Sequence, residues 1–184
     1  MTELLTPVCD FGKKAYDFEL KGTDNKIWTL SDCRGEKGLL VMFICNHCPY
    51  VKAILEKLVM ETDVLAMKGI GCVAINPNDY ISFPDDSFEN MAKVSKKHGF
   101  GFPYLIDENQ EIAKKYESIC TPDFFGYNKD LELQYRGRFD DRGIDSVINP
   151  NQSDLFKAMF AVSRTGKGPT EQQPSIGCSI KWRK

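Results

Sequence analysis

The stretch GLLVMFICNHCPYVKAILEKLV, residues 38–59, decides the fold of this 184-residue chain. Its first part, Gly38 to Cys45, is a continuous apolar run, which is typical of a central β-strand buried on both faces. A helix is expected to start at Pro49, since the N–H that proline lacks has no partner in the first helical turn. Apolar residues then recur at spacings of three and four, which predicts a helix face packed on the sheet. These residues are Val51, Ile54, Leu55, Leu58 and Val59.

Two cysteines, Cys45 and Cys48, stand where the strand gives way to the helix. Cys48 immediately precedes the helix, so its sulfur can accept hydrogen bonds from the backbone N–H groups of the first turn. The positive end of the helix dipole favours an anionic sulfur there, and His47 and Lys52 can add positive charge. Because the thiolate is the nucleophile toward disulfides and peroxides alike, the motif predicts redox chemistry at Cys48.

Structural and metal-binding interpretations fit this Cys-x-x-Cys pair less well. A buried cysteine often serves as a small apolar residue, and we interpret Cys72 in this way. A structural zinc site needs a second pair of ligands, whereas the chain has no second Cys-x-x-Cys pair and only two histidines, His47 and His98. Covalent haem attachment needs a histidine directly after the second cysteine, where this chain has Pro49. We therefore expect redox-active cysteines and neither a metal nor another cofactor.

The remaining periodicity predicts an α/β fold with a central mixed sheet flanked by helices. Alternating residues predict an N-terminal β-hairpin with strands at 15–20 and 26–30. Further strands are expected at 70–75, 103–106, 123–128 and 131–135, and further helices at 84–98, 110–116 and 153–165.

Two expectations concern the ends of these elements. The helix at 84–98 follows Ser82 and begins with Asp85 and Asp86, which we interpret as helix-capping residues. We expect one domain over residues 1–166 and a C-terminal tail over 167–184. Apolar residues alternate in the tail from Ile176 to Trp182, which predicts an added edge strand.

The composition is that of an ordinary globular protein, with 42% hydrophobic and 27% charged residues. The net charge is −2 and the basic residues are scattered, so we expect neither a nucleic-acid partner nor a membrane partner. The stretch from Met1 to Phe18 lacks the continuous apolar run of a secretory signal. Seven cysteines without such a signal predict a reducing compartment, and we expect a cytoplasmic protein.

Four motifs carry a resemblance to a known family. They are CNHCPYVK at 45–52, CTPDFF at 120–125, YRGRFDD at 135–141 and GCSIKW at 177–182. With the apolar strand before them, they resemble the thioredoxin-like superfamily, and within it the peroxiredoxin-like (AhpC/TSA-type, redoxin) branch. The resemblance covers nearly the whole chain. It implies a thioredoxin-like fold and a thiol-dependent enzyme.

The resemblance implies roles for four residues. The attacking cysteine falls on Cys48, and Cys45 stands where a peroxiredoxin has a threonine beside the reactive sulfur. Cys45 is therefore the expected resolving partner. Thr121 and Pro122 match the segment in which a cis-proline flanks the active cysteine and docks the substrate backbone.

The chain also departs from the family pattern. Pro122 stands where a typical peroxiredoxin has a peroxide-polarising arginine, and Arg136 or Arg138 can replace it only if their hairpin folds back over the site. The buried acid of thioredoxins would fall on Met42, which leaves Cys45 without an identified proton acceptor. Thiol–disulfide exchange is therefore favoured over peroxide reduction. Either reaction implies a disulfide or peroxide substrate and a cellular thiol reductant.

Other hypotheses stay open at this point. Cys178 is interpreted as a packed strand cysteine, with a role as an alternative resolving thiol as the competing interpretation. A copper–thiolate carrier would use Cys45, Cys48 and a histidine, either His98 or His47. A redox-inactive binding module would use the fold as a scaffold only. The sequence leaves the oligomeric state open.

Overall fold

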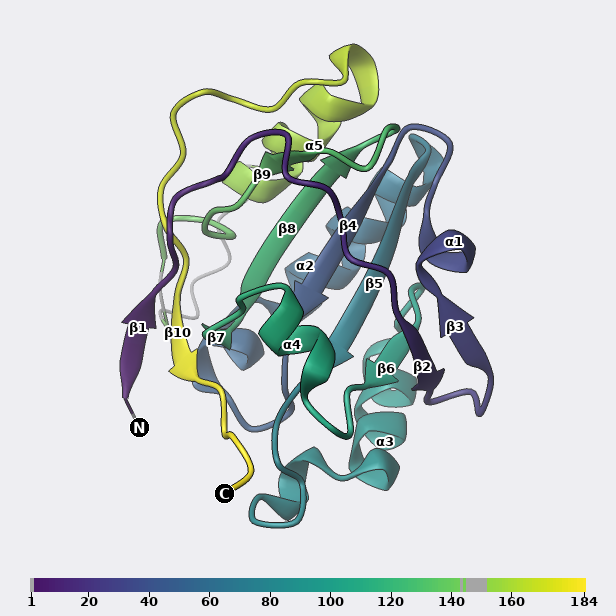
Figure 1. Cartoon of the computed structure of the whole chain (residues 1–184), viewed down its shortest axis with the longest axis vertical. Coiled ribbons are helices and arrows are strands. Elements are labelled where there is room, and N and C mark those ends of the chain that lie inside the picture. The colour runs from purple at the N-terminus through teal and green to yellow at the C-terminus, as the bar shows by residue number, and fades with distance from the viewer. Residues whose placement is uncertain (1, 143, 145–151) are drawn as a thin grey trace.

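The structure, a computed structural model, describes residues 2–142, 144 and 152–184. Its main sheet has seven strands in the spatial order β3-β2-β6-β5-β4-β8-β9 (Figure 1). In chain order these are β2 (Glu19–Gly22), β3 (Ile27–Thr29), β4 (Gly38–Phe43), β5 (Ile70–Asn76), β6 (Tyr104–Ile106), β8 (Asp123–Asn128) and β9 (Leu133–Tyr135). Because β4 pairs parallel with β5 and antiparallel with β8, the sheet is mixed, as predicted.

Helices cover both faces of this sheet (Figure 1). Residues of α2 (Pro49–Met67), α3 (Phe88–His98) and α5 (Asp154–Thr165) pack in the core on one face. Residues of α1 (Leu30–Cys33) and α4 (Glu111–Lys115) pack in the core on the other. Within the described part of the chain, no helix has the length and apolar character needed to cross a membrane.

Strand β4 separates the two cores. Leu40 and Met42 belong to the core under α2, whereas Leu39, Val41 and Phe43 belong to the core under α4. All six residues of the strand are buried. Since side chains alternate between the faces of a strand, a strand buried on both faces must be apolar at every position. The continuous apolar run therefore predicted the central strand correctly.

Helix α2 also follows the prediction. It begins at Pro49, and the five apolar residues of its predicted inner face are all buried. It ends two residues before Gly69, whose φ of 85° lies in the left-handed region that glycine adopts without strain. The strand-to-helix connection that carries the two cysteines is thus fixed at both sides by buried elements.

Two predicted boundaries differ from the structure. The first hairpin strand begins at Glu19 rather than at residue 15, because Ala15 and the residues before it bond instead to residues 131–133. The helix predicted at 84–98 is a short 3₁₀ turn at Pro84–Asp86 followed by α3, and the N-cap of α3 is Ser87. The predicted capping role of Asp86 is therefore wrong.

A second sheet joins both ends of the described chain. It contains β1 (Glu3–Leu5), β10 (Ile176–Ser179) and β7 (Cys120–Thr121), with β10 in the middle (Figure 1). The alternation in the tail correctly predicted a strand, but the edge position was wrong. Strand β1 pairs with one side of β10 and β7 pairs with the other, so β10 is a central strand. With three residues, β1 is too short to leave a periodic signal in the sequence.

Because β4 has a core on each side, Leu39→Ala and Leu40→Ala should each lower the free energy of unfolding by about 2–5 kcal/mol. Urea unfolding monitored by circular dichroism measures both values. The control is Met60→Ala on the exposed side of α2, which should change stability by no more than about 0.5 kcal/mol. A small effect at either leucine would contradict the two-core arrangement.

Candidate active site

The two motif cysteines lie in the short connection between β4 and α2. Cys48 is the N-cap residue of α2, with the extended backbone (φ −68°, ψ 123°) that this position requires. Pro49 follows in the first turn and fixes the direction in which the helix leaves. Both sulfur-bearing residues are buried, Cys45 with 2% and Cys48 with 0% of its surface exposed. The site is therefore an internal one, closed in the reduced protein.

The Cys48 sulfur contacts groups from two distant parts of the chain. Its Sγ lies 3.2 Å from Sγ of Cys178 and 3.1 Å from the carbonyl oxygen of Thr121. Cys178 belongs to β10 and Thr121 to β7, so the second sheet forms one wall of the site. All seven cysteines are present as thiols.

These surroundings lower the pKa of Cys48 to about 5. The largest cause is a hydrogen bond from the Cys45 thiol, and burial opposes it because a charged sulfur loses its hydration. The backbone amide of Val51, in the first turn of α2, and the thiol and amide of Cys178 lower the pKa further. The first-turn amide lowers the pKa in the predicted direction, but the Cys48 side chain makes no capping hydrogen bond to α2. The effects of the two thiols emerge only from the fold.

The pKa values of the two neighbouring thiols, Cys45 and Cys178, are raised instead. The pKa of Cys45 is raised, chiefly because its proton is held in the hydrogen bond to Cys48 and also because it is buried. The pKa of Cys178 is raised to about 12, first by burial and then by its bond to Cys48. Of the three neighbouring thiols, Cys48 is therefore the one whose surroundings favour the thiolate.

Thr121 and Pro122 lie against both motif cysteines. The peptide bond between them is cis, as the family resemblance implied. The Thr121 hydroxyl is 3.2 Å from the Cys45 sulfur, and its carbonyl faces Cys48. The outer backbone edge of Thr121 is paired with β10, so the edge to which the resemblance assigned substrate docking is filled by the chain itself.

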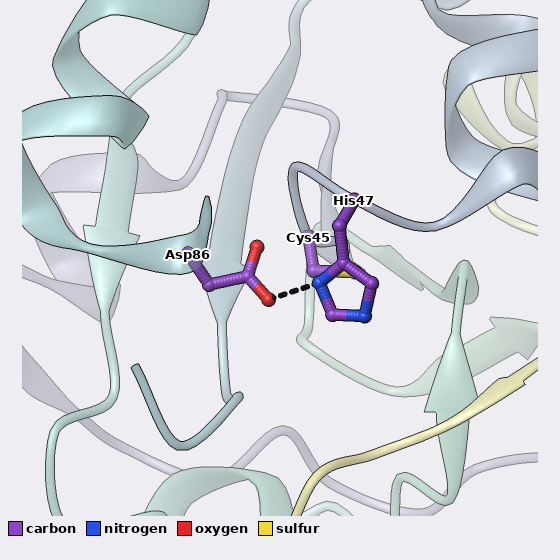
Figure 2. A group of neighbouring side chains, drawn as sticks. All are labelled: Cys45, His47 and Asp86. Carbon is purple, nitrogen blue, oxygen red and sulfur yellow. Dashed lines mark hydrogen bonds and ion pairs between the residues drawn. The ribbon is translucent and has the colours of Figure 1, made fainter. Parts of the chain in front are cut away.

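A buried acid that the sequence analysis did not assign to the site completes it. The Asp86 carboxylate accepts a hydrogen bond at 2.6 Å from Nδ1 of His47 (Figure 2). The same carboxylate accepts bonds from the backbone N–H of Asn46 at 2.7 Å and from the amide of Asn78 at 2.8 Å. These donors outweigh the effect of burial and hold the pKa of Asp86 below its usual range.

The consequence for His47 is a raised pKa, caused first by the hydrogen bond to Asp86. The imidazole also stacks on the ring of Phe83. No local signal distinguishes Asp86 from Asp85, because only the 3₁₀ turn decides which of them faces inward. The tuning of Cys48 by His47 stays a prediction.

Lys52 and His98 line a surface cavity. This cavity of about 510 Å³ lies between α2 and α3 and is also lined by Asn46, Asp85 and Lys93. The Lys52 side chain is exposed. Its proposed influence on the Cys48 thiol also stays a prediction. The copper-carrier hypothesis loses His98 as a ligand beside Cys45, since His47 is the histidine that lies there.

Arg136 and Arg138, the two candidates to replace the peroxide-polarising arginine of peroxiredoxins, both bind carboxylates. Arg136 is buried, lies 3.0 Å from Asp123 and stacks on the Phe125 ring. Arg138 lies 2.7 Å from Asp154. The buried acid that thioredoxins carry at the position of Met42 is absent here. The carboxylate near the site is that of Asp86, which comes from the turn before α3.

One group of potential metal ligands includes a motif cysteine. Ligand atoms of Cys45, His47 and Asp86 lie within 4.8 Å of one another (Figure 2). The Asp86 oxygens already accept hydrogen bonds from His47, Asn46 and Asn78, so a cation would have to displace a proton from this network. The donor set is therefore better suited to holding protons than to holding an ion.

Comparisons with known proteins agree with the fold and the motifs. Residues 11–139 match the model of the AhpC/TSA family. An uncharacterized conserved protein from Geobacillus kaustophilus is similar over 100% of this chain and 97% of its own, with 41% identity and a TM-score of 0.93. A hypothetical protein from Sinorhizobium meliloti is similar over 97% of this chain and 98% of its own, with 39% identity and a TM-score of 0.92. The peroxidoxin BcpB from Mycobacterium tuberculosis shares the fold over 84% of this chain and 96% of its own, with 16% identity and a TM-score of 0.61. No curated protein matches the chain.

The ionisation of Cys48 can be followed without reagent access. Thiolate absorbance in the ultraviolet should rise by one sulfur with a midpoint near pH 5, because the pKa of every other cysteine is raised. Cys48→Ser should remove this step. Cys45→Ala should move it to higher pH through loss of a donor, whereas Cys45→Ser keeps a donor and should shift it less. A midpoint independent of residue 45 would contradict the assignment.

The Asp86–His47 pair makes a separate prediction about pH. Asp86→Asn should lower the pKa of His47, measured by NMR in a His98→Gln background, and Asp85→Asn is the matched control. Because the folded-state pKa of His47 is raised, the pair stabilises the fold fully below the unfolded pKa of about 6.5. That stabilisation is lost as pH rises through the folded pKa. An unchanged His47 titration in the Asp86 variant would rule out the interaction.

Proposed function

Since the chain belongs to the AhpC/TSA family, we propose that it catalyses thiol–disulfide exchange, with Cys48 as the attacking thiol and Cys45 as its resolving partner. The observation that carries this proposal is the placement of the Cys48 sulfur. It stands at the N-terminus of α2 and accepts a hydrogen bond from the Cys45 thiol. A stabilised thiolate with a second thiol in contact is the minimum equipment for this reaction.

The reaction proceeds in two displacements. The Cys48 thiolate attacks one sulfur of the substrate disulfide, so a Cys48–substrate bond forms and the other substrate sulfur leaves as a thiolate. Cys45 then gives up its proton and attacks the Cys48 sulfur, which forms a Cys45–Cys48 disulfide and releases the second substrate thiol. Two electrons have passed to the substrate, and a cellular thiol reductant returns the pair to the reduced state.

Neighbouring residues support these steps. The His47–Asp86 pair has ligand atoms within 4.8 Å of the Cys45 sulfur. Only the neutral form of His47 can accept the Cys45 proton, and its raised pKa means that this form becomes populated as the pH rises. Thr121 holds Cys45 through its hydroxyl. Because β10 fills the backbone edge of Thr121, a substrate that docks against Thr121 and Pro122 must first displace β10.

Peroxide reduction is the second candidate, and one observation favours it. Cys48 is completely buried, and a small oxidant needs less opening of the site than a disulfide does. A sulfenic acid formed on Cys48 would be resolved by the same thiols. Against it, Arg136 and Arg138 are engaged by carboxylates, so neither is available to polarise a peroxide.

The thiols also bear on where the protein works. Seven cysteines in one chain, five of them packed in the core or the site wall with raised pKa values, suit a reducing compartment such as the cytoplasm. The proposed partners are a small or protein disulfide and a thiol reductant.

The test compares oxidised glutathione with hydrogen peroxide as oxidants of the reduced protein, with thiols trapped and masses measured over time. Oxidised glutathione should be consumed by the wild type and not by Cys48→Ser. A Cys45→Ser/Cys178→Ser double variant should stop as a glutathione adduct on Cys48. Buried Cys72→Ser is the matched control and should react as the wild type does.

Two outcomes would change the proposal. Faster oxidation by peroxide than by the disulfide would select the second candidate. Adducts on a cysteine other than Cys48 would exclude both reactions as written.

A further inference from the structure

The strand β10 is seated directly on the backbone of the active site. Its Cys178 pairs with Thr121, and Ser179 pairs with Cys120. The pairing continues beyond the strand, since Ile180 N–H donates to Ile119 at 3.1 Å. An unpaired strand edge is a template for adding an extended segment. Here the segment that is added belongs to the same chain.

Gly177 allows β10 to approach this closely. A Cβ atom at this position would stand 2.3 Å from the carbonyl oxygen of Thr121, far inside the distance that real side chains keep. The neighbouring Ser175 hydroxyl donates to the carbonyl of Pro122 at 2.9 Å. The close fit therefore depends on a missing side chain at one residue, next to the cysteine that faces the site.

The fit brings a second thiol to Cys48. The two sulfur atoms lie 3.2 Å apart, compared with about 2.05 Å in a disulfide. Cys178 is 2% exposed and Cys48 is fully buried, so both sulfurs are held inside the protein. The Cys48 sulfur thus contacts Cys178 on the terminal strand, while the Cys45 thiol on its own loop lowers its pKa.

We propose that Cys178 is a third redox thiol, and that the disulfide of the active site moves from Cys45–Cys48 to Cys48–Cys178. The inference rests on the proposed function, which supplies the first bridge. The Cys178 sulfur attacks the Cys48 sulfur, the Cys48–Cys178 bond forms and the Cys45–Cys48 bond breaks. Cys45 leaves as a thiolate and takes up the proton that Cys178 loses. No net oxidation occurs, so no further reactant is needed.

The moved bridge has a structural effect that the first bridge lacks. Cys45–Cys48 links two residues of one loop, whereas Cys48–Cys178 ties the start of α2 to the last strand. In the reduced protein β10 is held by hydrogen bonds and packing alone. The terminal sheet therefore becomes covalently locked to the site in one oxidised form and not in the other.

The test uses the chromogenic disulfide dithiobis-nitrobenzoate on the reduced full-length chain. Cys45→Ser should still release two equivalents of thionitrobenzoate, and peptide mapping should find a Cys48–Cys178 bridge. The wild type should be a mixture of molecules with the Cys45–Cys48 bridge and molecules with the Cys48–Cys178 bridge. Cys178→Ser should form only the Cys45–Cys48 bridge.

Gly177→Val provides a second variant with every thiol intact. Displacing β10 should reduce the Cys48–Cys178 bridge relative to Cys45–Cys48 on the order of tenfold, because the local concentration of Cys178 falls. Ile176→Val on the same strand is the control and should retain the wild-type ratio.

The outcomes separate this inference from the proposed function. A Cys45→Ser protein that releases one equivalent and keeps the reagent on Cys48 would overturn the role of Cys178 and leave Cys48 as the attacking thiol. Absence of any reaction that depends on Cys48 would overturn the proposed function itself. An unchanged bridge ratio in Gly177→Val would overturn the dependence on β10.

Discussion

The structure of the site depends on the need to keep a charged sulfur inside a protein. An anion removed from water is stable only where hydrogen-bond donors replace the water that it has lost. Cys48 finds such donors in the Cys45 thiol, the Val51 amide and the thiol and amide of Cys178. The helix start supplies one of these and the other elements must supply the rest. Much of the arrangement around α2 follows from this requirement.

The terminal sheet is the clearest consequence. β10 brings the thiol and amide of Cys178 to the sulfur, β7 pairs with β10 on one side, and β1 pairs with it on the other. Residues separated by most of the length of the chain thus meet around one atom. The Tyr50 hydroxyl in α2 donates to Glu3 of β1 at 2.5 Å, which joins this sheet to the helix that activates the thiol.

The sequence predicted the parts of the site that depend on local pattern. The apolar run of β4, the proline at the start of α2 and the cis-proline motif each carry a signal within a few residues. The positions of Asp86 and Cys178 at the site carry no such signal, because they depend on contacts across the fold. The sequence predicts Asp86 as a helix cap, because a proline and two acids commonly begin a helix. Cys178 keeps two interpretations, a packed strand cysteine and an alternative resolving thiol, because a strand cysteine looks the same in the sequence whichever neighbour it meets.

The position of β10 in the chain also has a meaning for biosynthesis. A chain made from its N-terminus produces β4, α2 and β7 before β10, and domains begin to fold as they are made. The nascent molecule therefore presents Cys48 with Cys45 beside it while the strand that carries Cys178 is still missing. During that interval the reactive sulfur lacks its last wall. Until that strand is made, the Cys48 sulfur lacks the thiol and amide of Cys178, two of the groups that favour its thiolate.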